Sequence, residues 1–262
     1  MAPIWARYGP FLFYGYTAML VLGVLLALFV TARLARQRAA TSEERADSAP
    51  AWLDAAIAAA IGAVIGGRVV FVWLNAAYFA ENPAEAWRFW LGGLNYHGAL
   101  LTGLLALWLW ACLTRRSFLH YAALLAPGLA LLVAFGWAGC LVEGCAFGRP
   151  ALPALLAADL PDDTGVYAMR YRTQALGVVF ALAVFALSWA SARRVPAAHL
   201  FWGTLAGLSL AHVFVALGRG DPSPVVFGMR LYLLAEVALL TVAVVALLAA
   251  SRQATSQSAP QK

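Results

Sequence analysis

Long apolar runs alternate with short polar connections along this chain. Seven of the runs have about the 20 residues that a helix needs to cross the hydrocarbon core of a bilayer. They cover approximately residues 11–33, 52–74, 97–113, 119–140, 173–192, 197–217 and 225–250. The composition agrees, because 63% of the 262 residues are apolar and only 11% are charged. The pattern predicts an all-α integral membrane protein with seven transmembrane helices in a single domain over residues 1–250.

Basic residues fall in every second connection between these runs. They are Arg33, Arg36, Arg38 and Arg45, then Arg115 and Arg116, then Arg193 and Arg194, and finally Arg252 and Lys262. Because cytoplasmic loops carry an excess of Lys and Arg, we expect the N-terminus outside and the C-terminus inside. The outer side then holds an interfacial arm at about 75–96 and a small periplasmic head or loop at about 141–172. Residues 251–262 are expected to form a flexible cytoplasmic tail.

The charge pattern and the start of the chain narrow the class further. The formal net charge is +6, but the arginines stand in short clusters between apolar runs, so we expect no nucleic-acid partner. The first apolar run is too long for the core of a secretory signal and no basic segment precedes it. We therefore expect the first helix to be retained.

Ionisable residues in or beside the spans are candidate functional residues, because charge is costly in lipid unless it faces protein or water. They are Asp54, Arg68, His97, Glu143, Arg149, His212, Arg219, Arg230 and Glu236. All but Asp54 fall toward the outer half of the predicted topology, with the depth of His212 left open. We expect any chemistry to take place near the outer leaflet.

His97 stands in the segment GGLNYHGALLTG, at the outer start of the third run. The glycines around it, Gly98 included, allow a substrate or another backbone to approach closely. A histidine there can act as a general base near neutral pH. The alternative is an interfacial histidine whose ring bonds a carbonyl group or water, and spacing alone leaves both hypotheses open.

The segment GWAGCLVEGCAFGRP, residues 136–150, closes the fourth run. Gly136, Cys140, Gly144 and Gly148 recur every four residues, which on a continuous helix makes one smooth face with Glu143 beside it. Small residues at this spacing commonly serve helix packing. The segment GAVIG at 62–66 has the same spacing, and there we prefer the packing interpretation.

Cys140 and Cys145 are five residues apart, so on a continuous helix their α-carbons would be roughly 8 Å apart and no disulfide could close. A bridge requires the helix to end between them, and Gly144 permits such an end. Three interpretations stay open: a redox pair, a reactive thiol, or two small residues buried in the membrane.

Arginines gather on the outer segments, where they could bind an anionic phosphate or headgroup. They are Arg149, Arg170, Arg172 and Arg219. Arginine side chains at an interface also extend to the lipid with no further role. Tyr14, at the outer end of the first run, is either a site residue or part of an aromatic belt.

Taken in order, these segments resemble the bacterial prolipoprotein diacylglyceryl transferase family. YGYTAMLVLG is similar to the start of the family's first span, and LDAAIAAAIGAVIGGRVVFVWLN to its second span. WRFWLGGLNYHGALLTGLLA is similar to the family's W-x-G-G-x-x-x-H-G-G-L-x-G-G motif. The similarity runs from about residue 11 to residue 250.

The resemblance implies a seven-span enzyme without a cofactor or metal, at the periplasmic face of the bacterial inner membrane. It would move diacylglyceryl from phosphatidylglycerol, or a related phospholipid, to the cysteine thiol of a prolipoprotein, recognised with its signal peptide. His97 would be the base, with Tyr14 and Glu143 as orienting residues. The expected substrate-binding residues are Arg68, Gly98, Cys140, Gly144, Cys145, Gly148, Arg149, His212 and Arg219.

The chain departs from the family's pattern at several polar positions. The signature G-R-x-G-N-F-x-N-G-E-x-x-G reads GWAGCLVEGCAFG here. Trp137 takes the place of the arginine that binds the lipid phosphate, while Cys140, Glu143 and Cys145 replace two asparagines and a glutamate. Further on, His212 and Ala216 replace an arginine and a glutamate, whereas Arg219 is retained.

These replacements keep two alternative hypotheses open. The first is a non-catalytic lipid- or lipoprotein-binding paralogue, which kept the fold and lost the phosphate site. The second is a thiol-exchange protein that uses Cys140 and Cys145 on the same scaffold.

Overall fold

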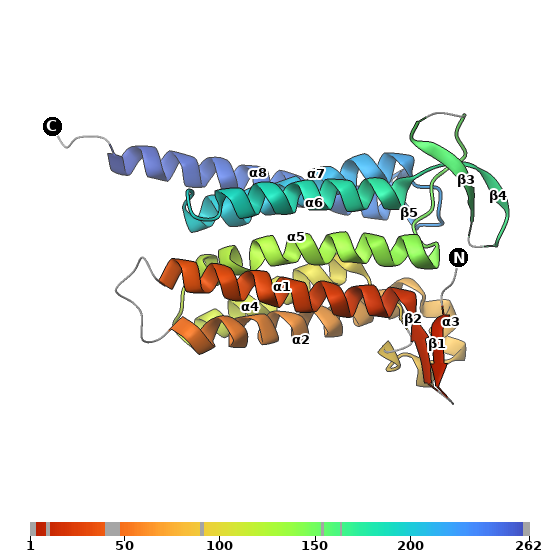
Figure 1. Ribbon diagram of the computed structural model, residues 1–262, viewed down its shortest axis with the longest axis horizontal. Helices are drawn as coiled ribbons and strands as arrows, with labels where there is room; N and C mark the ends of the chain where they lie inside the picture. Colours follow the sequence, from red (N-terminus) through yellow and green to blue (C-terminus); the bar gives the residue numbers. More distant parts are fainter. Residues whose placement is uncertain are drawn as a thin grey trace. The chain divides into compact units, whose positions relative to one another are not determined.

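Seven long helices make up most of the protein. The computed structural model describes residues 4–8, 11–39, 48–89, 92–152, 155–162 and 164–258. The helices are α1 (Gly15–Ala39), α2 (Ser48–Leu74), α4 (Tyr96–Leu113), α5 (Phe118–Glu143), α6 (Thr173–Ser191), α7 (Ala197–Gly218) and α8 (Leu231–Ser258) (Figure 1). All seven are long and apolar enough to cross a membrane. The predicted seven-helix, multi-pass membrane protein is thereby confirmed.

The predicted starts of two spans were wrong, because the first residues of these apolar runs form strands of β-hairpins. Phe11–Tyr14 is strand β2, paired antiparallel with β1 (Ile4–Tyr8). Val225–Val226 is strand β5, paired with β6 (Met229–Arg230) through a turn in which Phe227 and Gly228 have positive φ. Aromatic and β-branched residues favour strands, but a short apolar run does not by itself distinguish a strand from a helix.

The last helix also differs from its predicted length. Helix α8 continues to Ser258, well into the segment predicted to be a tail, although its membrane-spanning part ends near Gln253. Residues 259–262 lie outside the described part of the chain. The flexibility of the tail stays a prediction.

The chain divides into two compact units, one with Met1–Val30 and Ala126–Lys262 and the other with Thr31–Leu125. In the second unit, α2 packs against α4 through glycines. The Thr102 hydroxyl donates to the Gly62 carbonyl oxygen over 2.8 Å, and a Cβ added at Gly66 would overlap the Thr102 side chain. The packing interpretation of the GAVIG segment is confirmed.

The predicted arm at 75–96 contains helix α3 (Ala76–Glu81) and the short 3-10 helix η1 (Pro83–Glu85). Arg68 near the end of α2 holds this segment by its guanidinium group. Its nitrogens donate to the carbonyl oxygens of Glu85, Ala86, Gly92 and Gly93 at 2.5–3.1 Å. The arm is therefore tied to α2, and its location at a membrane interface stays a prediction.

The predicted head at 141–172 contains a β-hairpin of β3 (Ala157–Pro161) and β4 (Tyr167–Tyr171). Asp162 organises its turn. The Thr164 hydroxyl donates to Asp162 over 2.6 Å, and Arg170 forms an ion pair with it at 2.8 Å. The Thr164 bond, the backbone N–H bonds and Arg170 together hold the pKa of the Asp162 carboxyl below its ordinary value.

Candidate functional site

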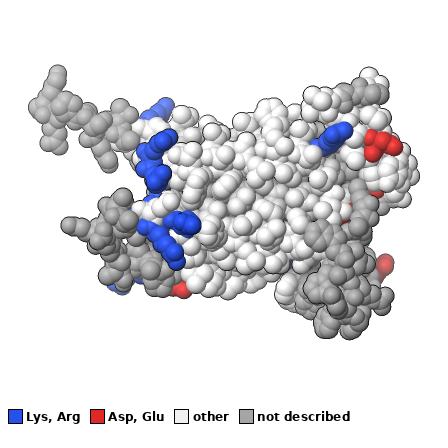
Figure 2. Space-filling model, in the orientation of Figure 1, with Lys and Arg blue, Asp and Glu red and all other residues white. Residues whose placement is uncertain are grey.

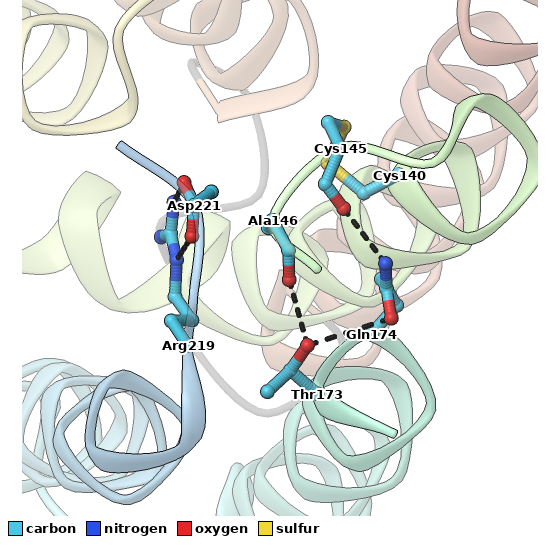
Figure 3. The surroundings of a disulfide bond; sticks show 7 residues. All are labelled: Cys140, Cys145, Ala146, Thr173, Gln174, Arg219 and Asp221. Carbon is cyan, nitrogen blue, oxygen red and sulfur yellow. Dashed lines mark hydrogen bonds and ion pairs between the residues drawn. A yellow bond between two sulfur atoms is a disulfide. The ribbon is translucent and has the colours of Figure 1, made fainter. Parts of the chain in front are cut away.

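Helix α5 ends at Glu143, between the two cysteines. Gly144 has φ +91°, and its N–H donates to the Cys140 carbonyl oxygen over 2.7 Å, as in a left-handed helix cap. The reversal brings the α-carbons of Cys140 and Cys145 to 4.7 Å, and the two residues form a disulfide (Figure 3). The condition stated for a bridge is thus met.

The smooth glycine face expected along residues 136–148 is wrong beyond Cys140. Gly144 and Gly148 lie past the end of α5, so they share no helix face with Gly136. A four-residue repeat gives one face only while the helix continues. Beyond Cys140, these glycines shape a turn and a close backbone contact instead.

The segment after the disulfide is attached to the first turn of α6. The Gln174 amide donates to the Cys145 carbonyl oxygen over 2.9 Å, and the Thr173 hydroxyl donates to that of Ala146 over 2.7 Å (Figure 3). Thr173 is fully buried and Gln174 nearly so. Sequence reasoning left these two residues out of the predicted site. The signal that could have identified them is a pair of polar residues at the start of an apolar run.

Gly148 lies where two loop segments cross. It pairs with Arg219 in an isolated β-bridge, and the neighbouring Arg149 N–H donates to the Gly218 carbonyl oxygen over 2.8 Å. A Cβ added at Gly148 would overlap the carbonyl oxygen of Tyr171. The structure therefore requires glycine at this position for close backbone approach.

Replacing Gly148 by alanine is expected to destabilise the protein by about 2 kcal/mol, because the new methyl group has to displace backbone. Thermal unfolding in one fixed detergent measures the change. The matched control is Gly136→Ala, where an added Cβ meets no atom within 4 Å. Equal unfolding temperatures for the two variants would contradict the role assigned to Gly148.

The disulfide itself gives a second expected result. Exchanging Cys140 and Cys145 together for serine should destabilise the protein by about 2 kcal/mol, the loop-closure value for so short a loop. In the intact protein, only Cys112 should react with an alkylating reagent before reduction, since it is the free cysteine. Cys112→Ser is the control. A double variant as stable as this control would show that the bridge has no structural role.

Cationic and aromatic side chains lie together between the end of α7 and the start of α8. The Arg219 guanidinium pairs with the Asp221 carboxylate and lies 4.3 Å from the centre of the Tyr232 ring. Arg230 donates to the Arg219 carbonyl oxygen and to the Tyr232 hydroxyl, both over 2.8 Å. Asp221 therefore compensates much of the positive charge expected from Arg219.

Arg149 is arranged differently from Arg219. It is exposed, and its guanidinium carbon lies 5.6 Å from the centre of the Tyr171 ring. Within the part of the chain that the structure describes, it forms no ion pair with an acidic residue. Both Arg149 and Arg219 were predicted to bind a phosphate. Of the two, Arg149 has the charge that is less compensated by an acidic partner.

A buried polar network joins α5, α7 and α8. The Trp137 indole N–H donates to His212 Nε2 over 3.0 Å, and His212 Nδ1 lies 2.9 Å from Glu236 Oε1. Because an indole nitrogen can only donate, Nε2 accepts and the ring proton on Nδ1 points to the carboxyl group. His212 is 8% exposed and Glu236 3%.

The ring of Trp137 also packs on α6, where a Cβ added at Gly177 would overlap it. The sequence resemblance implies that Trp137 and His212 stand at two positions where the family has arginines, and in this chain they bond to each other. His212 is therefore engaged with Trp137 and Glu236. Glu236, named among the ionisable residues but not among the site residues, is the third member of the network.

In the other unit, His97 lies in the first turn of α4. The N-cap residue Asn95 accepts from the Gly98 N–H over 2.9 Å, which starts the helix just before the imidazole. The half-buried His97 ring meets the Tyr96 ring edge to face, with centres 5.2 Å apart. Gly98 is buried against the Gly66 carbonyl oxygen, so the close approach expected there is made by backbone.

The remaining predicted site residues lie at chain reversals. Tyr14 is the last residue of β2, directly before α1, and is half-buried. Glu143 is the exposed last residue of α5. Among the described residues, no group of three or more His, Cys, Asp or Glu side chains could hold a metal ion.

Comparison with known proteins identifies the family. Residues 3–250 match the model of the family described as prolipoprotein diacylglyceryl transferase. A phosphatidylglycerol–prolipoprotein diacylglyceryl transferase from Nitratidesulfovibrio vulgaris is 30% identical over 74% of this chain and 71% of its own length. The protein of the same name from Trichormus variabilis is 30% identical over 84% and 79%, respectively. The chain belongs to the prolipoprotein diacylglyceryl transferase family.

Proposed function

We propose that this protein transfers diacylglyceryl from phosphatidylglycerol, or a related phospholipid, to the cysteine thiol of a prolipoprotein. The membership of the family and the names of both relatives support this reaction. The observation that carries it is His97, half-buried in the first turn of α4 within the motif GGLNYHGALLTG. The bottom-up chemistry agrees, since a thiol must lose a proton before it attacks.

The proposed step is a substitution at carbon. The thiol proton passes to the His97 imidazole, and the sulfur attacks the glyceryl carbon that carries the phosphate ester. The carbon–sulfur thioether bond forms as the carbon–oxygen bond breaks. The electron pair of that bond leaves with glycerol phosphate, whose negative charge needs cationic donors.

The other roles follow from the contacts of each residue. Arg149 is proposed to bind the phosphate, with Arg219 as a weaker contributor because Asp221 already pairs with it. Tyr14 and Glu143 are proposed to orient the substrates. Arg68 donates to four carbonyl oxygens of the arm, so we assign it to holding that segment.

The remaining predicted site residues are proposed to support the site from within their own units. Gly98 allows α2 and α4 to pack closely, and Gly148 allows two loop segments to cross. Cys140, Gly144 and Cys145 fix the end of α5, and His212 belongs to the buried network with Trp137 and Glu236.

The proposed location is the bacterial inner membrane, with the N-terminus outside, the C-terminus inside and the active face in the periplasm. The positive-inside rule supports this, because the basic connections follow α1, α4 and α6. In the unit that holds α6, α7 and α8, Figure 2 shows Arg side chains at the helix ends that lie away from the β3–β4 hairpin, and basic side chains also beside the hairpin. The prolipoprotein is expected to present its signal peptide from the membrane.

The experiment that tests the reaction uses a strain depleted of its own transferase. The full-length protein is expressed there, and lipidation of a reporter lipoprotein is followed by its shift in mobility and by mass spectrometry. Restored lipidation is the expected result. No lipidation from a correctly inserted protein would overturn the proposal, and lipid that co-purifies without turnover would then favour a binding paralogue.

The disulfide favours a second candidate function, thiol exchange. Cys145 is exposed, so an external thiolate could attack its sulfur and release Cys140 as the leaving thiolate. In the Cys140→Ser variant, the free Cys145 thiolate would attack an added small disulfide, form a mixed disulfide with one half and release the other half as a thiolate. If Cys140 and Cys145 are alkylated without reductant at every applied redox potential, this candidate is excluded.

A further inference from the structure

A hollow of about 220 Å³ lies between α6 and α7, far along these helices from the disulfide. One face of each helix lines it, with Val184, Leu187 and Ser191 on α6 and His199, Gly203 and Gly207 on α7 among its residues. The lining has apolar, hydroxyl-bearing and imidazole side chains. The start of α6, where Thr173 and Gln174 hold the segment after the disulfide, is about 16 Å from Val184 and about 27 Å from Ser191 at 1.5 Å per helical residue.

The glycines of α7 make the hollow. A Cβ added at Gly203 would meet no atom within 4 Å, so the space beside it is open. A Cβ added at Gly207 would come within 3.2 Å of the Val184 side chain, which marks the inner limit of the space. From His199 to Gly207 the hollow extends about 12 Å along the helix.

Neighbouring side chains place the mouth of the hollow at headgroup level. Trp189 and Trp202 flank it on α6 and α7, and tryptophan gathers at membrane interfaces. Arg193 and Arg194 follow in the connection between the helices, where the Arg194 N–H donates to the Ser191 carbonyl oxygen over 2.8 Å. The hollow therefore runs from the headgroups into the acyl-chain region.

The polar groups at the mouth suit a particular headgroup. The Ser191 hydroxyl donates its proton to the Leu187 carbonyl oxygen over 2.8 Å, so its oxygen remains able to accept. Arg193 and Arg194 are both exposed, and neither forms an ion pair with an acidic residue in the described ranges. Two cations that follow this acceptor by two and three residues in the chain complement a phosphate that carries a headgroup hydroxyl.

We propose that this hollow binds one anionic glycerophospholipid from the leaflet next to the α6–α7 connection. One acyl chain fills the space beside Gly203, and the phosphate lies against Arg193 and Arg194. A lipid is the occupant because α6 and α7 cross the membrane, and its charge follows from the two arginines. This site is separate from the proposed transferase site and does not depend on that reaction.

Photo-crosslinking in nanodiscs tests the proposal with the full-length protein. Phosphatidylglycerol with a diazirine in one acyl chain is compared with phosphatidylcholine that carries the same group, and the labelled peptides are mapped. Labelling of residues 184–207 should be about tenfold stronger with phosphatidylglycerol, given two arginines near the headgroup. Labels elsewhere, including at the proposed transferase site, are scored separately.

Two variants identify the cause of the labelling. Gly203→Leu should remove most of the label at 184–207, because its side chain enters open space and fills the hollow. Arg193→Gln with Arg194→Gln should abolish the preference for phosphatidylglycerol without altering the helices. The matched control, Arg36→Gln with Arg115→Gln, removes the same charge from exposed positions of the other unit.

Equal labelling by the two lipids in the unmodified protein would overturn the proposal. So would labelling of 184–207 that the Gly203→Leu variant leaves unchanged. If that variant does not fold, the double variant Arg193→Gln with Arg194→Gln still tests the proposal. A preference for phosphatidylglycerol that persists in this double variant contradicts the proposed site. Loss of transferase activity with unchanged labelling would count against the proposed function alone.

Discussion

Replacing His97 by alanine is expected to lower the kcat/KM of diacylglyceryl transfer by about 10²–10⁴-fold, the contribution of a well-placed general base. The imidazole is held in the first turn of α4, which Asn95 caps through the Gly98 N–H. Without it, the acceptor thiol has no base positioned to take its proton. The measurement is the rate of transfer from labelled phosphatidylglycerol to a peptide with a lipoprotein signal sequence.

The control for this variant is His120→Ala. His120 lies in the first turn of α5, which follows α4 in the sequence. The control variant should transfer at nearly the normal rate. The separate effects on kcat and KM distinguish a base from a packing residue, because loss of a base lowers kcat with little change in KM. An active His97→Ala protein would exclude His97 as the base.

Replacing His212 by alanine is expected to destabilise the protein by about 3 kcal/mol, because two groups each lose a hydrogen-bond partner at a cost of roughly 1–3 kcal/mol. The variant removes the acceptor of the Trp137 N–H and the donor to Glu236 at once. Both groups lie inside the helix bundle of their unit, where water cannot replace the lost bonds. Thermal unfolding in detergent should show a fall of about 6–12 °C.

Two milder variants separate the contributions of the Trp137 bond and the Glu236 bond to this destabilisation. Trp137→Phe keeps an aromatic ring beside Gly177 but loses the N–H and part of the indole volume, so it should cost about 1–2 kcal/mol. Glu236→Gln keeps an oxygen that accepts from His212 Nδ1 and should lie between the two. If His212→Ala unfolds at the same temperature as the unmodified protein, the network does not hold α5, α7 and α8 together.

The number and approximate position of the helices followed from the sequence, because a bilayer of fixed thickness requires apolar runs of a set length. The same rule could not locate the β1–β2 and β5–β6 hairpins. Strands β2 and β5 are as apolar as the helices that follow them, and only the pairing of each with its partner strand distinguishes them.

The candidate site divides in a similar way. His97 and Tyr14 became candidates from the motifs that resemble the family, and their roles stay predictions. The disulfide could be stated only as a condition, because its closure depends on where α5 ends. Arg68 could not be assigned from its position alone, since its partners are carbonyl oxygens of residues 85–93, well along the chain.

The length of the apolar runs thus determines the spans, since a span depends only on residues that are neighbours in the chain and on the thickness of the membrane. The partners of the polar groups depend on which distant residues the packed helices bring together. Trp137 and His212 are 75 residues apart and meet at 3.0 Å, and no local pattern encodes that contact. The resemblance implies that both positions hold arginines in the family, and packing makes them a bonded pair here, because a polar group buried among helices must find its partner inside the protein.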